Sequence, residues 1–235
     1  MSSLVSALGI QKYELTLPSS GRRIHYRPFL VKEEKLLLIA SESKNENEIY
    51  NAINQVVSSC TFGEFESNNA PVIDLEYLFL KIRSKSVGEK ATPSIKCGKC
   101  GVSSEINVDL SEIEPVINEE HKKKIVISPD VIVEMGYPRL KDMEIFNEDR
   151  PELDKATSVL ASCIQTVYTK NEVFHAKDIE REEIENFILH LSQDQLKKMM
   201  GFIETMPKLK KEVDFECKKC QNKEKITLEG MRDFF

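Results

Sequence analysis

The chain has 235 residues, of which 40% are hydrophobic and 31% are charged, and its formal net charge is −6 at pH 7. This composition is typical of a globular protein that buries a hydrophobic core, and the negative charge does not favour general nucleic-acid binding. No apolar run approaches the roughly 18 residues that span a bilayer, so we expect no membrane partner.

The N-terminal part of the chain predicts a β-hairpin followed by helices. Apolar and polar residues alternate on both sides of the turn Pro18-Ser-Ser-Gly21, which predicts a hairpin over residues 13–27. Residues 32–90 carry apolar side chains at helical spacing and are expected to form a helical segment. Asp74 is expected to cap the last of these helices, because a carboxylate can accept backbone N–H bonds there. Residues 1–12 are interpreted as a loose or partner-dependent arm.

Two Cys-x-x-Cys pairs follow, Cys97-Gly-Lys-Cys100 and Cys217-Lys-Lys-Cys220. Each pair lies between strand-like segments, which predicts a first knuckle over residues 93–108 and a second knuckle over residues 211–229. A turn between two strands directs two sulfurs at one metal ion, and two such turns complete a closed tetrahedral site. We therefore expect Cys97, Cys100, Cys217 and Cys220 to bind one structural zinc ion.

The spacing between the two pairs is unusual, since more than a hundred residues separate them. A compact zinc ribbon has about 15–20 residues there. If one zinc ion joins both pairs, residues 109–210 form a helical insertion with a short strand pair, and the metal ties the C-terminal part to the middle of the chain. We accordingly predict a single connected domain over residues 1–235.

The insertion itself has clear local patterns. Short strands are expected around Ser128-Pro129-Asp130, and a helix is expected from Pro151 to Tyr168. A capping-box pattern, Ser192-Gln-Asp-Gln195, opens a further helix whose apolar side chains, including Met199 and Phe202, are interpreted as core. The predicted fold class is α+β: a helix-rich body with short β-hairpins and a split zinc-ribbon-like pair of knuckles.

Other interpretations of the cysteines stay open. A redox Cys-x-x-Cys normally opens a helix after a strand and acts alone, whereas here the pattern occurs twice and strand-like sequence follows each copy. Disulfides require an oxidising compartment, and no signal peptide is visible at Met1-Ser-Ser-Leu. The two pairs could also remain apart, each metal-free or completed by a partner. Cys60 and Cys163 are interpreted as small buried hydrophobes.

Three blocks of the sequence form a recognisable series: Leu17-Pro-Ser-Ser-Gly-Arg-Arg-Ile-His-Tyr-Arg-Pro-Phe-Leu, Asp74-Leu-Glu-Tyr-Leu-Phe-Leu, and Val131-Ile-Val-Glu-Met-Gly-Tyr-Pro. In this order they resemble a family of virion proteins, the baseplate hub subunits of T-even-type contractile-tailed bacteriophages. The resemblance runs from about residue 13 to about residue 150. It implies a structural or assembly component of the tail baseplate hub, whose partners are other hub proteins. It also implies a protein made in the host cytoplasm and located in the virion.

No catalytic signature accompanies this resemblance. The sequence contains no G-x-S-x-G, H-E-x-x-H, Walker or G-x-G-x-x-G pattern. A closed four-cysteine zinc site has no open position for a substrate or water. We therefore expect no enzymatic activity and no small-molecule substrate.

The alternative function is that of a zinc-ribbon module that binds nucleic acid or the transcription machinery. Lysines surround the cysteine pairs and could contact phosphates; they are Lys96, Lys99, Lys218, Lys219, Lys223 and Lys225. The same lysines could simply keep an exposed hairpin soluble and offset the charge of the thiolates. The acidic chain and the scarcity of nearby aromatic residues make nucleic acid an unlikely partner.

Overall fold

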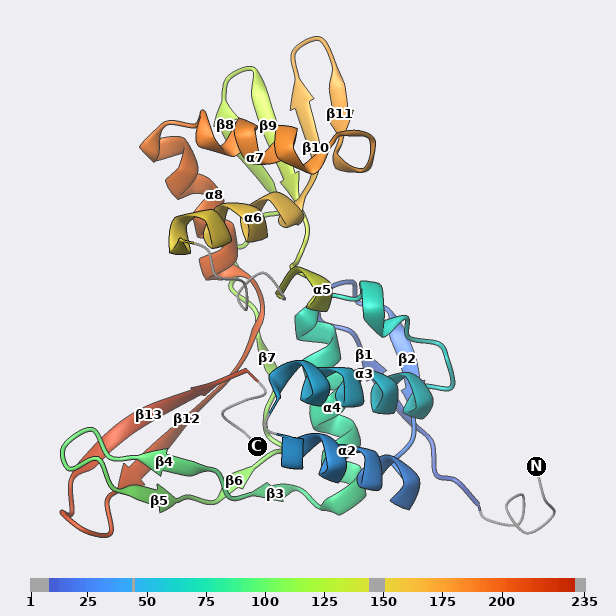
Figure 1. The fold of residues 1–235 in the computed structure, drawn as a ribbon, viewed down its shortest axis with the longest axis vertical. Helices are drawn as coiled ribbons and strands as arrows, with labels where there is room; N and C mark the ends of the chain where they lie inside the picture. Colours follow the sequence, from blue (N-terminus) through green and yellow to red (C-terminus); the bar gives the residue numbers. More distant parts are fainter. Residues whose placement is uncertain (1–8, 44, 144–150, 231–235) are drawn as a thin grey trace. The chain divides into compact units, whose positions relative to one another are not determined.

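A computed structural model of the chain describes residues 9–43, 45–143 and 151–230. Two units can be distinguished along it (Figure 1). Unit 1 comprises the residues up to Val116 together with those from Lys208 onward, and unit 2 comprises Ile117–Pro207. The domain boundaries expected from the sequence remain a prediction.

Unit 1 begins with the expected hairpin, in which β1 (Tyr13–Thr16) pairs antiparallel with β2 (Arg23–Tyr26). The helices that follow are α2 (Val31–Ser43), α3 (Glu46–Cys60), the short 3-10 helix η1 (Ser67–Asn69) and α4 (Val72–Val87). Helix α4 is apolar on nearly every side and is buried accordingly. Its buried side chains include Leu75, Leu78, Phe79, Leu80 and Ile82. It therefore forms the centre of the helical part of unit 1.

The predicted capping role of Asp74 is wrong. The N-cap of α4 is Pro71, and Asp74 lies within the first helical turn, where it is buried. Its carboxylate accepts hydrogen bonds from the Ser19 backbone N–H at 2.9 Å and from the Ser19 hydroxyl at 2.5 Å. Asp74 thus anchors the turn of the N-terminal hairpin to α4. Local sequence could not indicate this role, because Ser19 lies 55 residues away.

Short strand pairs continue unit 1 after α4. Strand β3 (Lys90–Ala91) pairs with β6 (Val108–Asp109), and β4 (Ser94–Lys96) pairs with β5 (Ser103–Glu105), all antiparallel. The β4–β5 pair brackets the first Cys-x-x-Cys turn, so the strands expected there are confirmed. These pairs are short, because residues 92–93 separate β3 from β4 and residues 106–107 separate β5 from β6, and they need a second layer to bury their apolar side chains.

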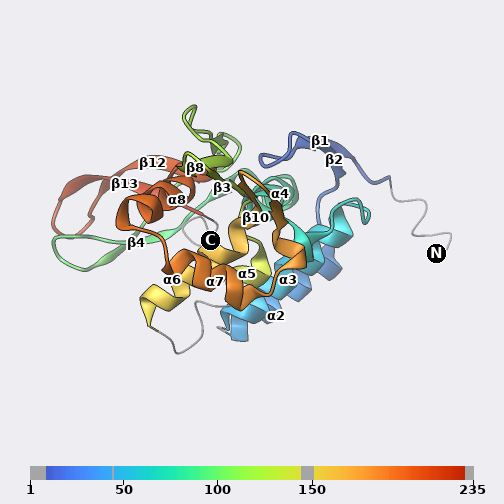
Figure 2. The same cartoon turned by 90° about the horizontal axis from the view of Figure 1, so that it is seen from above.

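That second layer comes from the C-terminal end of the chain. Strands β12 (Lys208–Glu216) and β13 (Lys223–Glu229) form a long antiparallel hairpin, and β7 (Pro115–Val116) pairs with the start of β12. The β12–β13 hairpin lies beside the β4–β5 hairpin in both views (Figures 1 and 2). A buried cluster joins the strands to α4; it includes Ile73, Tyr77, Leu80, Val108, Leu110, Ile113, Leu209 and Leu228.

Unit 2 contains an antiparallel four-stranded sheet with the strand order β11-β10-β9-β8. The strands are β8 (Lys124–Ser128), β9 (Val131–Met135), β10 (Ile164–Thr169) and β11 (Val173–His175). The other elements of the unit are α5 (Leu140–Met143), α6 (Glu152–Cys163), η3 (Ala176–Asp178), α7 (Arg181–Leu189) and α8 (Gln193–Thr205). The buried apolar side chains of α6, α7 and α8 form one cluster with those of the sheet: Ile127, Val133, Met135, Leu160, Ala161, Cys163, Ile164, Ile188, Met199 and Phe202.

The helix predicted from Pro151 to Tyr168 is shorter than expected. Helix α6 ends at Cys163, and the chain continues as strand β10. Residues 164–169 are mostly β-branched or aromatic, which suits a strand, and β10 pairs with β9 on one side and β11 on the other. Pairing with two neighbouring strands therefore overrides the helical spacing that the sequence also shows.

Other expectations are confirmed. The mixture of helices with small antiparallel sheets fits the α+β class. The capping box at Ser192 is present, with both reciprocal bonds to Gln195. Met199 and Phe202 belong to the core, with exposed fractions of 0% and 1%. Among the helices that the structure describes, none combines the length and apolar character needed to cross a membrane.

Candidate metal centre

The two Cys-x-x-Cys turns meet in unit 1. The first joins β4 to β5, and the second joins β12 to β13. All four sulfur atoms lie within 4.8 Å of one another. The Sγ atom of Cys97 lies 3.7 Å from that of Cys220, and the Sγ atom of Cys100 lies 3.6 Å from that of Cys217. The sequence left open whether the two pairs meet, and the fold brings them together.

These separations fit a tetrahedral metal site. A zinc–thiolate bond is about 2.3 Å long, so two sulfurs on one tetrahedral ion lie about 3.8 Å apart. A disulfide would need about 2.05 Å instead, and all four cysteines are free. The four sulfurs are therefore close enough to bind a metal ion. In the described ranges, no other cluster of His, Cys, Asp and Glu side chains was found with this potential.

Both knuckles have the same backbone hydrogen bonds. In each, the N–H of the first cysteine donates to the carbonyl of the residue five positions later. The N–H of the residue after the second cysteine donates back to the carbonyl of the first cysteine. That following residue has a positive φ in both turns, 69° at Gly101 and 58° at Gln221. Glycine adopts this conformation freely, whereas glutamine does so at a cost, so the second turn is the more strained.

Backbone N–H groups favour the thiolate at one position before any metal binds. Hydrogen bonds from the N–H groups of Cys220 and Lys219 lower the pKa of Cys217 to about 6. The pKa of Cys220 is raised, because burial and the neighbouring thiols outweigh the hydrogen bond from the Asn222 N–H. A bound cation would favour the thiolate form of the sulfurs that coordinate it.

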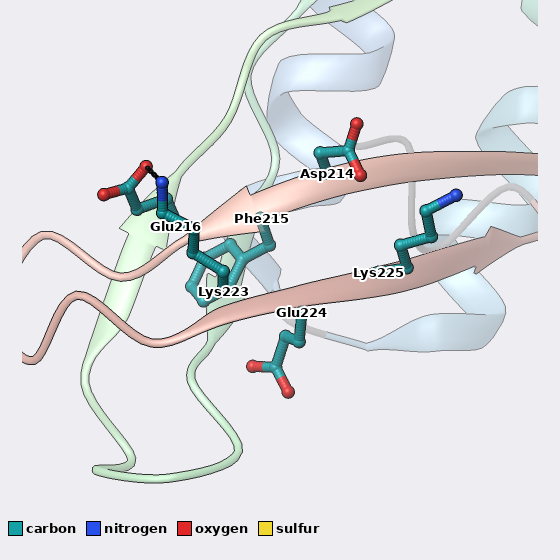
Figure 3. Close-up of a pocket in the computed structure, with 6 residues that line it drawn as sticks. All are labelled: Asp214, Phe215, Glu216, Lys223, Glu224 and Lys225. Atoms are coloured by element: carbon teal, nitrogen blue, oxygen red, sulfur yellow. Dashed lines mark ion pairs between the residues drawn. The ribbon is translucent and has the colours of Figure 1, made fainter.

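Both hairpins supply apolar neighbours of the sulfurs: Ile95 and Ile106 from the first, and Phe215 and Ile226 from the second. Phe215, which is 1% exposed, packs with Cys97 and Cys217 in a small buried cluster. Phe215 and Glu224 lie opposite each other on β12 and β13 and project to the same face of the hairpin (Figure 3). A pocket of about 400 Å³ lies along this hairpin, lined by Asp214, Phe215, Glu216, Lys223, Glu224 and Lys225.

Sequence reasoning did not single out Phe215 or Glu224. Neither residue has a ligand spacing relative to the cysteines, and Glu224 resembles any charged residue on an exposed strand. The only available signal was the alternation within β12, which places Phe215 among the inward-facing positions. The importance of both residues depends on the packing of two hairpins that are distant in the sequence.

The two remaining cysteines lie elsewhere. Cys60 and Cys163 are both fully buried, and burial raises their pKa values to about 11 and about 12. Cys163 belongs to the apolar cluster of unit 2, whereas the Cys60 sulfur accepts a hydrogen bond from the Arg27 guanidinium at 3.6 Å. Both are buried neutral thiols, which confirms their burial, but only Cys163 lies among apolar side chains. The redox interpretation of the two pairs gains no support from the fold, since a strand and not a helix follows each turn.

These features define a small α+β protein with a four-cysteine cluster that is suited to metal binding. In a comparison with protein families, the model described as "T4 bacteriophage base plate protein" matches residues 10–235. The match covers most of the chain, and the protein therefore belongs to the family of T4-type phage baseplate proteins. Comparisons with curated proteins and with solved structures return no significant match.

Family membership determines the general role. The protein is a structural component of a bacteriophage tail baseplate, which implies interactions with other baseplate proteins and a location in the virion tail. The family is a structural one, and this suggests a role without catalysis. The resemblance noted in the sequence is thus confirmed for the baseplate family as a whole.

Proposed function

We propose that the protein is a structural or assembly component of the baseplate hub, held together by a zinc ion bound to Cys97, Cys100, Cys217 and Cys220. One observation carries the metal proposal: four sulfurs converge at tetrahedral spacing from segments more than a hundred residues apart. Four thiolates complete the coordination of zinc, so the ion would have no open position for a substrate.

In this proposal the metal supplies folding energy. The knuckle end of unit 1 has a small buried core of Cys97, Phe215 and Cys217, and the side chains packed against it are only partly buried: Ile95, Ile106, Cys220 and Ile226. Such a core cannot offset the conformational entropy that two hairpins lose on ordering. Structural zinc can contribute on the order of 10 kcal/mol to the folding of a small domain. The ion would therefore link the C-terminal hairpin to the middle of the chain and stabilise the surface that other baseplate proteins contact.

Metal content and thermal stability test the proposal together. We expect elemental analysis of the purified protein to find one zinc per chain, and a chelator to lower the Tm. The variant Cys97→Ser should lose the metal and show the same lowered Tm without chelator. If the chelator removes the metal and the Tm stays the same, the proposal is contradicted. If elemental analysis finds iron in place of zinc, the site stands but the identity of the ion is corrected.

The hub assignment is supported by the three sequence blocks that resemble hub subunits. Its test is the position of the protein in isolated tails. A small epitope tag added before residue 1 should be labelled at the centre of the baseplate when the tails are viewed by electron microscopy. Label at the rim would contradict the hub assignment while leaving membership of the baseplate family intact.

The alternative role in nucleic-acid binding has little support in the structure. Lys96, Lys99, Lys218 and Lys219 are exposed, as phosphate-binding residues would be. The thiolates beside them carry the opposite charge and offset them locally, and Lys223 forms an ion pair with Glu216 at 3.3 Å. The baseplate family also favours a protein partner. A salt-sensitive gel shift at micromolar affinity would be needed to revive this role.

A further inference from the structure

We infer that Glu224 is a positioning residue of the metal centre, which holds the first knuckle in register with the second by accepting a hydrogen bond from the backbone of Gly98. The inference rests on the proposed metal centre and extends it, because Glu224 is not one of the four ligands. It assigns a role to a carboxylate that the sequence alone presents as an ordinary surface residue.

The contact joins two segments that are far apart in the chain. The Gly98 N–H donates to Glu224 Oε1 with an N–O distance of 3.1 Å, across 126 residues. Gly98 lies directly after Cys97 in the first turn, and Glu224 lies on β13 shortly after the second turn. One hydrogen bond therefore connects the backbone beside one ligand to the hairpin whose turn carries the opposite pair of ligands.

Gly98 has no side chain, and this leaves room for the Glu224 carboxylate. A Cβ atom at this position would lie 3.2 Å from Glu224 Oε2, which is tighter than most Cβ contacts, and 3.7 Å from Oε1, which is an ordinary contact. The backbone of Gly98 has no positive φ, so the absence of a side chain here is not explained by the conformation of the turn. The carboxylate lies over the glycine, and the glycine permits that approach.

The hydrogen bond, and not the charge, explains the position of Glu224. Four thiolates around a divalent cation carry a net negative charge, and a nearby carboxylate is repelled by it. That repulsion would lower the metal affinity unless the hydrogen bond raises it by more, by holding the first knuckle in position. Partners that orient metal ligands from outside the coordination sphere typically change metal affinity by about 10–100-fold. The inference therefore predicts that a neutral side chain with the same oxygen acceptor can replace Glu224.

The same hairpin offers a matched control. Glu216 lies on β12 directly opposite Lys223, and it forms its ion pair with Lys223 on the face opposite to Glu224 (Figure 3). It is also a glutamate close to a cysteine turn, so removing it alters the charge near the cluster by the same amount. It makes no hydrogen bond to the first knuckle in the described structure. Glu216→Ala thus reproduces the change in charge without the loss of the Gly98 contact.

The test is a Co²⁺ titration of the full-length, metal-free protein, followed by competition with Zn²⁺, with thiolate-to-cobalt absorption as the signal. We expect Glu224→Ala to bind both ions roughly 10–100-fold more weakly than the wild type. Glu224→Gln should stay within about threefold of the wild type, because its amide oxygen accepts the same hydrogen bond. Glu216→Ala should also stay within about threefold, because exposed ion pairs contribute little.

A double-mutant cycle isolates the contact itself. Gly98→Ala should weaken binding in the wild-type background, because its methyl group displaces the carboxylate, and should have a much smaller effect in the Glu224→Ala background. Equal losses in both backgrounds would overturn the inference. So would a Glu224→Ala protein that binds as tightly as Glu216→Ala, or a Glu224→Gln protein that binds as weakly as Glu224→Ala.

The outcomes also separate this inference from the metal centre on which it rests. If the wild type gives no cobalt–thiolate absorption, the metal centre is wrong and the role of Glu224 is lost with it. If the wild type binds tightly and the Glu224 variants behave like the control, the metal centre stands and only the role of Glu224 is wrong.

Discussion

Unit 2 and the knuckle end of unit 1 bury very different amounts of apolar surface. In unit 2, one cluster of buried side chains connects the sheet to helices α6, α7 and α8. At the knuckle end, the buried cluster consists of Cys97, Phe215 and Cys217, and two of these three are candidate metal ligands. The side chains packed against it are only partly buried: Ile95, Ile106, Cys220 and Ile226. One region can be stabilised by burial alone, whereas the other has polar turns, exposed lysines and little core.

This difference shows where a metal ion is needed in a fold. Apolar burial contributes roughly 25 cal/mol per Å², so a cluster of three side chains contributes only a few kcal/mol. Ordering the two knuckle turns costs about 1–2 kcal/mol per residue in backbone entropy. A four-thiolate metal site can supply what this small core does not. The comparison therefore predicts that the two regions respond to different perturbations.

Metal removal should have the largest effect. With chelator, or in the variant Cys217→Ser, we expect hydrogen exchange to rise sharply in peptides from residues 93–108 and 211–229. Peptides from unit 2 should keep most of their protection, because their core does not involve the metal. The folding free energy that the metal contributes to the knuckles, and that its removal takes away, is on the order of 10 kcal/mol.

Cys60→Ala is the matched control for this experiment, since it removes a buried thiol outside the cluster. It should keep the full metal content and the normal exchange of both knuckles. Equal loss of protection in unit 2 and in the knuckles after metal removal would break the comparison.

Truncating one phenylalanine in each region should give the next largest effect. Phe202→Ala should lower the free energy of unfolding of unit 2 by about 3–5 kcal/mol, because Phe202 is fully buried in its core. Phe215→Ala should destabilise the knuckles and weaken metal binding. Excess Zn²⁺ should therefore restore part of the stability that Phe215→Ala loses. At a free Zn²⁺ concentration 100 times the Kd of the site, the gain is about 2.7 kcal/mol. Zn²⁺ should restore none of the stability that unit 2 loses in Phe202→Ala. Urea unfolding with and without added Zn²⁺ distinguishes the two.

Acid should reveal a third source of stability in the helical part of unit 1. The Arg27 guanidinium lies 2.9 Å from the Glu33 carboxylate, and both side chains are 6% exposed. Burial alone would raise the pKa of Glu33, but hydrogen bonds from Arg27, the Leu30 N–H and Ser59 lower it to about 2. Because the folded pKa lies below the ordinary value of 4.5, this contribution is present above pH 4.5 and is lost as the pH falls toward 2.

We expect Glu33→Gln to lose about 3 kcal/mol of stability at pH 7, and this difference from the wild type should shrink as the pH is lowered from 5 to 3. A metal ion bound to the cysteines would be lost at low pH in both proteins, so comparing them cancels that effect. Glu34→Gln, one position further along α2, is the control and should change little. A pH-independent difference between Glu33→Gln and the wild type would show that the ion pair does not contribute as described.

The smallest expected change in stability comes from substitutions at the matching positive-φ positions of the two knuckles. Gln221→Gly should stabilise the zinc-bound protein by up to about 1 kcal/mol, because glycine relieves the cost of the positive φ. Gly101→Ala places a side chain at the matching position and should destabilise by a similar amount. Urea unfolding of the zinc-bound proteins measures both. A loss of stability in Gln221→Gly would indicate that the Gln221 side chain makes a contribution larger than the strain.

The structure also shows how far sequence reasoning reaches in this protein. The N-terminal hairpin, the strands beside each cysteine pair and the capping box at Ser192 were all predicted correctly, because each depends on residues that are close in the chain. The end of α6 and the role of Asp74 were predicted wrongly. The first depends on strand pairing with β9 and β11, and the second on a serine in a distant turn.

The sequence by itself determined the chemistry available to this protein: four cysteines in two turns, with strands on either side and no catalytic pattern. Spacing of a few residues is sufficient for this, because a Cys-x-x-Cys turn directs its two sulfurs to one point wherever it occurs. Only the tertiary structure decided that the two turns meet and that Glu224 bridges them. Those contacts join segments more than a hundred residues apart, and they exist only because β12 and β13 pack beside β4 and β5.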